Sequence, residues 1–294
     1  MNEDGLTRFI LERANVRGAI VSLNASWRSI VERSSYPPAV SVYLAECTAA
    51  AVLFSASIKI DGRLSIQMRG EGVIRTLFSE CNTAGSIRGI AHFHEPVPAH
   101  VALSDFGPDA VLAISIENAH TEGREAQRYQ GMVSLQAATL SAAFEGYFEQ
   151  SEQLPTRILL FGNAVQAVGM LIQQLPEQAG ASDDWQRAQM LFDTATEAEL
   201  FELDTEDLLY RLFHQEDVRV LEHKSIIFAC SCSRERVENM LLSLGQQEIA
   251  QTADEQGEIS VNCDFCGQSY HFTAEQGLSL FWPKPTAPSS SRLQ

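Results

Sequence analysis

The spacing of apolar residues changes along the chain and predicts three regions of different structure. Over residues 1–178, stretches that alternate apolar and polar residues are interspersed with stretches of helical spacing, which is typical of a mixed α+β domain. A helix is expected over residues 135–153, and Asp61-Gly62 predicts the turn of a β-hairpin over residues 58–70. Strands are expected over residues 16–25, 27–34, 86–94, 110–118, 129–135 and 156–163.

The longest apolar segment, residues 39–58, predicts a helix with a proline at its first turn. Its length would permit a membrane span. Glu46 lies inside the segment, however, no basic cluster flanks it, and alanine, serine and threonine dilute it, so a buried helix between core layers is favoured. The chain opens with acidic residues and shows no basic stretch followed by an apolar one. We therefore expect a cytoplasmic protein without a secretory signal or membrane association.

Residues 179–229 are rich in acidic residues and show helical spacing without a strand pattern. Asp204 or Thr205 is expected to cap the last of three short helices in this region. Helices this short are marginal alone and need a surface to dock on, which predicts an acidic helical linker; a simple connector between domains is the alternative. The apolar faces of the helices would be formed by Trp185, Phe192, Phe201, Leu208, Leu209, Leu212 and Phe213.

Residues 230–281 predict a third, small unit, and the proline- and serine-rich tail 282–294 is expected to be disordered. Ser233 can cap a helix that ends at Gly245. The apolar positions of this helix are Val237, Met240, Leu241 and Leu244.

Two strands and a final short helix are expected in the rest of the small unit. The strands cover residues 258–263 and 268–272, on either side of a pair of cysteines. Thr273 and Gln276 have the spacing of a capping box, which predicts a helix directly after the second strand.

Four of the six cysteines lie in this unit, as the pairs Cys230/Cys232 and Cys263/Cys266. A unit of about 50 residues buries too little apolar surface to fold well unaided. In a reducing compartment, where structural disulfides are rare, four thiolates around one zinc ion can supply the missing stabilisation. In an extended segment residues i and i+2 project to one side, and Gly267 permits the turn after the second pair. The sequence therefore predicts that these four cysteines bind one zinc ion.

Other chemistry is disfavoured. Four sulfur ligands leave no open position for a substrate, which argues against a catalytic zinc. A thiol oxidoreductase is disfavoured because the second cysteine pair precedes a strand-like segment instead of opening a helix. His271 alternates with apolar neighbours, and His92 and His94 have only Glu95 as a nearby carboxylate, so none of them is expected to bind metal. Nothing resembles a phosphate loop, a nucleophile elbow or a catalytic dyad, and we expect no enzymatic activity.

The net charge of −17, from 38 acidic and 21 basic residues, disfavours binding to nucleic acid. A hydrophobic content of 45% and a charged content of 20% are typical of a soluble globular protein. Cys47 and Cys81 lie in apolar surroundings and are expected to be small buried side chains.

Further segments accompany the cysteine pairs. They are Asp4, Arg8, Phe9 and Arg17-Gly18 near the start, "YFEQSEQLPT" at 147–156, "DLLYRLFHQEDVRV" at 207–220, and "CSRERVE" at 232–238, which begins with the second cysteine of the first pair. Together with the cysteine spacing, these segments resemble the redox-regulated heat-shock chaperonins of about 33 kDa, a family of bacterial holdases, over essentially the whole chain.

The resemblance implies that Cys230, Cys232, Cys263 and Cys266 bind zinc in a reduced, inactive protein. Oxidants acting together with an unfolding stress would form the disulfides Cys230–Cys232 and Cys263–Cys266, release zinc and disorder the acidic linker. The apolar surface exposed in this way would hold unfolding client proteins without using ATP. The resemblance further implies a homodimer in the active state, and hand-over of clients to ATP-dependent chaperones after reduction.

A binding module with an inert structural zinc knuckle is the competing interpretation. The two interpretations differ in what oxidation does, because an inert knuckle would keep both its zinc and its fold under mild peroxide.

Overall fold

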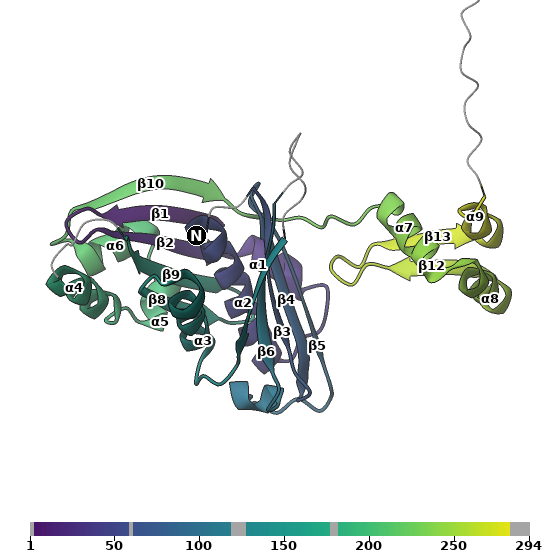
Figure 1. Ribbon diagram of the computed structural model, residues 1–294, viewed down its shortest axis with the longest axis horizontal. Helices are drawn as coiled ribbons and strands as arrows, with labels where there is room; N and C mark the ends of the chain where they lie inside the picture. The colour runs from purple at the N-terminus through teal and green to yellow at the C-terminus, as the bar shows by residue number, and fades with distance from the viewer. Residues whose placement is uncertain (1–2, 59–60, 119–127, 177–181, 283–294) are drawn as a thin grey trace, which may run out of the picture. The chain divides into compact units, whose positions relative to one another are not determined.

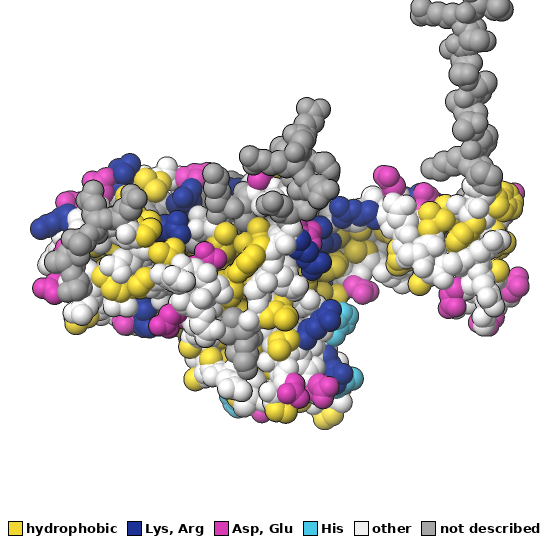
Figure 2. Space-filling view, in the orientation of Figure 1, with side chains coloured by type: hydrophobic (Ala, Val, Ile, Leu, Met, Phe, Trp, Pro, Cys, Tyr) yellow, Lys and Arg dark blue, Asp and Glu magenta, His cyan; other side chains and the backbone are white. Residues whose placement is uncertain are grey.

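The computed structural model describes residues 3–58, 61–118, 128–176 and 182–282 and divides the chain into two compact units, Met1–Cys230 and Ser231–Gln294 (Figure 1). The predicted disordered tail lies outside the described residues except for Trp282. On the face shown in Figure 2, acidic side chains are scattered over both units and do not form one patch.

Two sheets form the framework of the first unit (Figure 1). The five-stranded sheet contains, in spatial order, β10 (Val218–Ser225), β1 (Gly5–Leu11), β2 (Val16–Leu23), β9 (Ala167–Gln174) and β8 (Thr156–Gly162). The six-stranded sheet contains β11 (Ile227–Phe228), β5 (Ser86–Phe93), β4 (Ile74–Asn82), β3 (Gly62–Arg69), β6 (Val111–Asn118) and β7 (Arg128–Ser134). All neighbouring strands are antiparallel except β11 and β5, which are parallel. The predicted mixed α+β fold is therefore confirmed.

The long apolar helix α2 (Pro38–Ser57) packs between the two sheets and contacts strands of both. The proline predicted for its first turn is Pro38. Within the described residues, α2 is the helix long and apolar enough to cross a membrane, but 67% of its most apolar window is buried inside the protein. It is therefore the central core helix, as the presence of Glu46 and the small residues predicted. Glu46 is half-buried, and burial together with the negative charge of Glu197 raises its pKa to about 8.

Two predictions for the first 70 residues are wrong. The strand expected over residues 27–34 is helix α1 (Ala25–Val31), because Trp27 and Ile30, three residues apart, are buried together. The carboxylate of Asp4 accepts hydrogen bonds from the backbone N–H groups at the start of this helix and thereby caps it. The hairpin at Asp61-Gly62 is also wrong, because Gly62 begins β3, whose two neighbours in the sheet are β4 and β6. Ile58 is the C-cap of α2, and residues 59–60 of the expected hairpin lie outside the described residues.

Most of the other elements expected in this unit are present. The predicted strands correspond to β2, β5, β6, β7 and β8, whereas β1, β4 and β9 were not predicted. The helix expected over residues 135–153 is shorter: α3 (Leu140–Tyr147) is capped by the hydroxyl of Thr139 and continues as the π-helical turn η2 (Phe148–Glu152). A single 3₁₀ turn, η1 (Leu103–Phe106), precedes β6.

The acidic region contains the three predicted helices, α4 (Ser182–Phe192), α5 (Glu197–Glu202) and α6 (Thr205–Phe213). Of the two proposed caps for α6, Asp204 is the one used: its carboxylate accepts a hydrogen bond of 2.9 Å from the backbone N–H of Asp207. The helices pack on the face of the five-stranded sheet that points away from α2. The expectation that this region has no strand is wrong, because it also forms β10 and β11.

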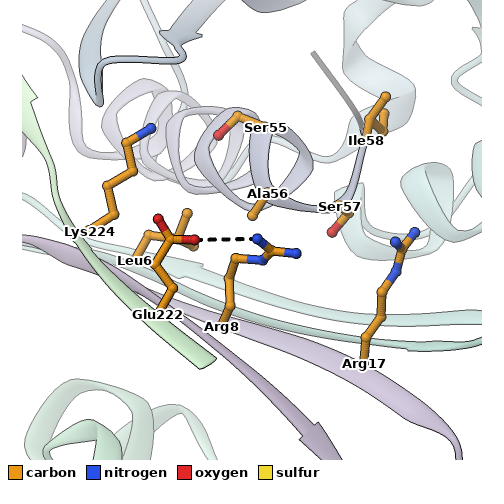
Figure 3. Close-up of a pocket in the computed structure, with 9 residues that line it drawn as sticks. All are labelled: Leu6, Arg8, Arg17, Ser55, Ala56, Ser57, Ile58, Glu222 and Lys224. Atoms are coloured by element: carbon orange, nitrogen blue, oxygen red, sulfur yellow. Dashed lines mark hydrogen bonds and ion pairs between the residues drawn. The ribbon is translucent and has the colours of Figure 1, made fainter. Parts of the chain in front are cut away.

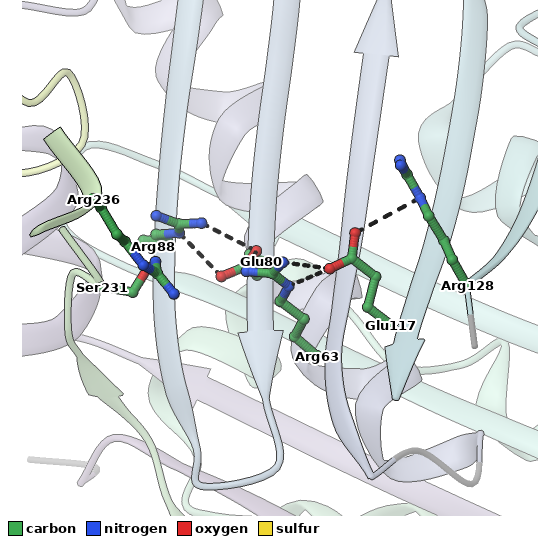
Figure 4. Close-up of polar contacts among 7 residues, drawn as sticks. All are labelled: Arg63, Glu80, Arg88, Glu117, Arg128, Ser231 and Arg236. Carbon is green, nitrogen blue, oxygen red and sulfur yellow. Dashed lines mark hydrogen bonds and ion pairs between the residues drawn. The ribbon is translucent and has the colours of Figure 1, made fainter. Parts of the chain in front are cut away.

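A row of alternating charges crosses the face of the six-stranded sheet that points away from α2 (Figure 4). Arg128 on β7 lies 3.6 Å from Glu117 on β6, which accepts a hydrogen bond of 2.7 Å from Arg63 on β3. Arg63 lies 3.8 Å from Glu80 on β4, and Glu80 pairs with Arg88 on β5 at 3.0 Å. Such cross-strand pairs help to fix the register of the sheet.

The second unit is small. It contains α7 (Arg234–Leu244), α8 (Gln246–Gln256), β12 (Glu258–Asn262), β13 (Ser269–Thr273) and α9 (Ala274–Ser279). The predicted cap Ser233, the end of α7 at Gly245, both strands and the Thr273/Gln276 capping box are all confirmed, whereas α8 was not predicted. Met240 and Leu244 on α7 are exposed. The buried apolar side chains of the described part of this unit are Val237, Leu241, Ile249, Ala253, Ile259 and Phe272.

Candidate metal centre

The structure brings together the four cysteines that the sequence predicts as ligands. The Sγ atoms of Cys230, Cys232, Cys263 and Cys266 all lie within 4.8 Å of one another, and all four residues are half-buried. In a tetrahedral zinc site with Zn–S bonds of about 2.3 Å, the sulfurs would be about 3.8 Å apart. The spacing, the purely thiol donor set and the partial burial therefore fit a single zinc ion.

A tight turn places the second cysteine pair. The carbonyl oxygen of Cys263 accepts hydrogen bonds from the backbone N–H groups of Cys266, at 3.3 Å, and Gly267, at 2.7 Å. Gly267 has a φ of +70°, in the left-handed region that favours glycine. The backbone N–H of Cys263 donates to the carbonyl oxygen of Gln268 at 2.9 Å, which closes the loop between β12 and β13. Both sulfurs of the pair thus face the same side of a hydrogen-bonded turn.

The first pair lies in the irregular segment between β11 and α7, directly before the cap of that helix. Arg236, in the first turn of α7, donates a hydrogen bond of 2.6 Å to the hydroxyl of Ser231, the residue between the two cysteines. The Sγ atoms of Cys232 and Cys266 are 3.3 Å apart, so the two pairs meet at these sulfurs.

Tyr270 on β13 donates a hydrogen bond of 3.1 Å from its hydroxyl to Sγ of Cys232, and this bond raises the pKa of Tyr270 to about 12. Tyr270 was not predicted as part of the site. The alternation of residues along the strand could have identified it. Tyr270 shares the inward side of β13 with the buried Phe272, whereas Ser269 and His271 point outward.

No histidine joins the cluster within the described part of the chain. The Nδ1 atom of His271 lies 3.6 Å from a carboxylate oxygen of Glu258, on the exposed side of the two-stranded sheet. His92 and His94 belong to no group of three or more potential metal ligands among the described residues. The sulfur cluster thus has the composition of a closed, structural metal site.

The remaining cysteines are buried in the first unit, as predicted. Cys47 on α2 contacts the sulfur of Met68 at 3.5 Å, and Cys81 on β4 contacts the hydroxyl of Ser55 at 3.5 Å. Burial raises the pKa of both thiols, which disfavours the reactive thiolate form. Their chemistry is therefore that of small apolar side chains.

Comparison with known proteins agrees with this picture. The sequence model of the family described as Hsp33 protein matches residues 4–273. A "33 kDa chaperonin" of Nitrosococcus oceani is 40% identical over 290 residues, which cover 99% of this chain and 98% of that protein. A protein of the same name from Chromobacterium violaceum is 38% identical over 280 residues, covering 95% and 94%.

A solved structure has the same fold. The crystal structure of a 33 kDa chaperonin (heat shock protein 33 homolog) from Thermotoga maritima superposes with a TM-score of 0.82, covering 95% of this chain and 98% of that one at 20% sequence identity. The four-cysteine cluster, the match to the family model over nearly the whole chain and the full-length relatives lead to one conclusion: the chain belongs to the Hsp33 family of chaperones.

Proposed function

We propose that the protein is a redox-regulated, ATP-independent holdase that binds unfolding proteins under oxidative stress. The observation that carries the proposal is the cluster of four sulfurs within 4.8 Å, formed by two pairs of cysteines that are each close in sequence. In the reduced form, Cys230, Cys232, Cys263 and Cys266 would bind one zinc ion and the protein would be inactive. Bound zinc would hold the four thiolates together and thereby stabilise the fold of the second unit.

Oxidation would remove the ligands pair by pair. Cys230 with Cys232, and Cys263 with Cys266, would each form a disulfide, giving up two electrons per bond. With hydrogen peroxide as oxidant, two thiolates and two protons react with one peroxide to give one disulfide and two water molecules. Disulfide sulfurs are poor metal ligands compared with thiolates, so the metal would be released.

The size of the second unit explains why metal release would unfold it. Its described part buries only the six apolar side chains of its core. These are too few to stabilise a unit of this size without a bound metal or a disulfide. A structural zinc site contributes about 10–16 kcal/mol at neutral pH, which is more than the total stability of most small domains. Loss of the metal is therefore expected to unfold the unit.

The acidic helices α4–α6 form the second part of the proposed activation mechanism. They are short and stay in place by packing on the five-stranded sheet, where Phe213 of α6 lies 6.1 Å from Phe9 of β1, measured between ring centroids. Undocking of these helices would expose an apolar surface for clients. The sheet side of this surface consists of Phe9, Leu11, Val16, Ile20, Val168, Met170 and Ile172.

The remaining parts of the proposal follow from the family. The active form would be a homodimer, and clients would pass to ATP-dependent chaperones once the cysteines are reduced again. The cytoplasm is the proposed location, because a reducing compartment keeps the four thiols available for zinc.

The decisive experiment treats the purified, reduced, zinc-loaded protein with hydrogen peroxide at elevated temperature. Zinc release is followed with a chromogenic chelator, and light scattering follows the aggregation of a thermally unfolding client protein. We expect zinc release and suppression of aggregation to rise together. Zinc release without suppression would contradict the holdase, and retention of zinc and fold under peroxide would instead support the inert structural knuckle.

A second measurement tests the coupling between the cysteines and the helices. Limited proteolysis should cut within residues 179–229 much faster after oxidation than before. A variant with Cys47→Ser is the matched control, because that thiol is buried away from the cluster, and it should respond to oxidation like the unmodified protein. Equal cleavage rates before and after oxidation would show that the helices do not respond to the cysteines.

A further inference from the structure

A cavity of about 320 Å³ lies between the five-stranded sheet and the C-terminal end of α2 (Figure 3). Three basic side chains from three strands line it: Arg8 on β1, Arg17 on β2 and Lys224 on β10. In Figure 3 all three project toward the end of α2. Such a concentration of positive charge is unexpected in a chain with a net charge of −17.

The positive charges of the cavity are only partly balanced. Arg8 pairs with Glu222 at 3.3 Å, but the two side chains are 41% and 54% exposed, so this pair is weak. Arg17 donates a hydrogen bond of 2.8 Å to the amide oxygen of Gln173, and Lys224 donates one of 2.6 Å to the backbone carbonyl of Thr83; both acceptors are neutral. Among the described residues that line the cavity, three cations thus face one carboxylate.

A hydrogen-bonded pair of residues, Gln173 and Thr156, holds Arg17 in position. Gln173, which accepts its hydrogen bond, is fully buried and donates from its own amide nitrogen to the hydroxyl of Thr156 at 2.7 Å. Burial, and to a smaller extent the positive charge of Arg8, lowers the pKa of Arg17, and the negative charge of Glu152 offsets part of this effect. The fold therefore holds two arginines of neighbouring strands at one cavity, and an anion bound between them would offset the repulsion of their like charges.

The C-terminal end of α2 balances part of the positive charge in the cavity. No basic residue lies in the last turn of the helix, whose C-terminal end, including Ser57, borders the cavity. The helix dipole places only about half a negative charge there. The three cations still exceed the two carboxylates Glu222 and Glu152 together with the helix end, so compensation of the helix end does not explain all three cations.

We propose that this cavity binds a small phosphate-type oxyanion, held by Arg8, Arg17 and Lys224. Guanidinium groups present forked donors that match phosphate oxygens, and lysine adds a point charge. The volume accommodates inorganic phosphate or pyrophosphate, or the phosphates of a nucleotide whose base stays outside. Because Lys224 belongs to β10 and the arginines to β1 and β2, the bound anion would tie the edge strand β10 to the sheet.

The test uses the full-length, reduced, zinc-loaded protein and isothermal titration calorimetry with inorganic phosphate, pyrophosphate and ADP, at constant ionic strength set with chloride. Replacing one of the charge-assisted contacts, in Arg17→Gln or Lys224→Gln, should weaken binding about tenfold or more. Glu222→Gln should tighten it, because a competing carboxylate is removed. Arg219→Gln is the matched control: it removes one positive charge from the same strand β10, at a residue that pairs with Glu12 outside the cavity, and should leave affinity unchanged.

Tighter binding of ADP than of pyrophosphate would identify a nucleotide as the ligand, and equal affinities would identify the free anion; either supports the site. Hydrogen exchange of the β10 amides should slow in the presence of the ligand. The proposal is overturned if phosphate-type anions bind no better than chloride. Equal weakening by Arg17→Gln, Lys224→Gln and Arg219→Gln would overturn it as well, because binding would then reflect general charge.

Discussion

The hydroxyl of Tyr270 donates a hydrogen bond of 3.1 Å to the sulfur of Cys232. A donor at this position withdraws electron density from one thiolate of the cluster, and the bond comes from a residue on the strand that follows the second cysteine pair. The sulfur of Cys232 is therefore stabilised by this contact as well as by whatever metal it binds.

Replacing Tyr270 with phenylalanine should accelerate the loss of zinc to peroxide. The ring remains in place, but the thiolate of Cys232 loses its hydrogen-bond donor and becomes a better nucleophile. Because a charge-assisted hydrogen bond to the thiolate is lost, we expect the rate of zinc loss to increase several-fold. The rate is measured by stopped flow with a zinc-sensitive chelator. Tyr210→Phe removes a hydroxyl from an exposed position on α6 and should leave the rate unchanged; identical rates for both variants would contradict the role of Tyr270.

Replacing Phe213 with alanine should loosen α6 from the sheet without touching the cysteines. Phe213 is fully buried, and truncation of such a side chain costs about 3–5 kcal/mol. We expect partial suppression of client aggregation by the reduced protein while zinc stays bound, together with faster proteolysis in the acidic helices. Tyr210→Ala on the same helix is the control, since Tyr210 is 73% exposed. If Phe213→Ala is destabilised but remains inactive until oxidised, helix docking does not restrain activity.

Removal of zinc by a chelator under reducing conditions should unfold the second unit and leave the core sheets of the first intact. The small buried core of the second unit and the three thiols that it contributes to the cluster lead to this expectation. Two-dimensional NMR of the isotope-labelled protein would show loss of dispersed signals from residues 231–282 alone. Retention of these signals would mean that the metal is dispensable for the fold.

The stability of the first unit should fall as the pH rises through the range set by Glu46. The pKa of this carboxyl is raised from 4.5 to about 8 in the folded protein, so between these values the folded state holds a proton that the unfolded state releases. The free energy of unfolding therefore decreases from about pH 4.5 to pH 8, by a few kcal/mol at most, because one pKa unit corresponds to about 1.4 kcal/mol.

Urea unfolding of Glu46→Gln tests this dependence. The variant should lose the part of the pH dependence that comes from this group and be more stable than the unmodified protein at pH 9. Glu197 lies on α5, so its charge contributes to the same effect. Glu197→Gln should recover a smaller part of the stability, and a pH profile unchanged in Glu46→Gln would exclude the carboxyl as the cause.

Two of the strands that were not predicted lack the alternation of apolar and polar residues for physical reasons. β9 is buried along almost its whole length on both faces, so it shows a continuous apolar run with no alternation. β10 is an exposed edge strand and shows no buried face at all. The strand expected at residues 27–34 is wrong because Trp27, Ile30 and Val31 have the i, i+3, i+4 spacing of a helix. The cap from Asp4 and the joint burial of Trp27 and Ile30 stabilise that helix.

Local sequence by itself determined the features whose partners are near in the chain. The cap of α7 by Ser233, the turn after Cys263 and the buried helix α2 each depend on residues within a few positions, so their patterns are readable directly. Only the tertiary structure decided the contacts between distant segments. Pairing of β10 with β1 joins residues more than 200 positions apart, and it alone brings Lys224 to Arg8 and Arg17. Local spacing carries no record of such pairings, because they are selected by burial and register across the whole fold.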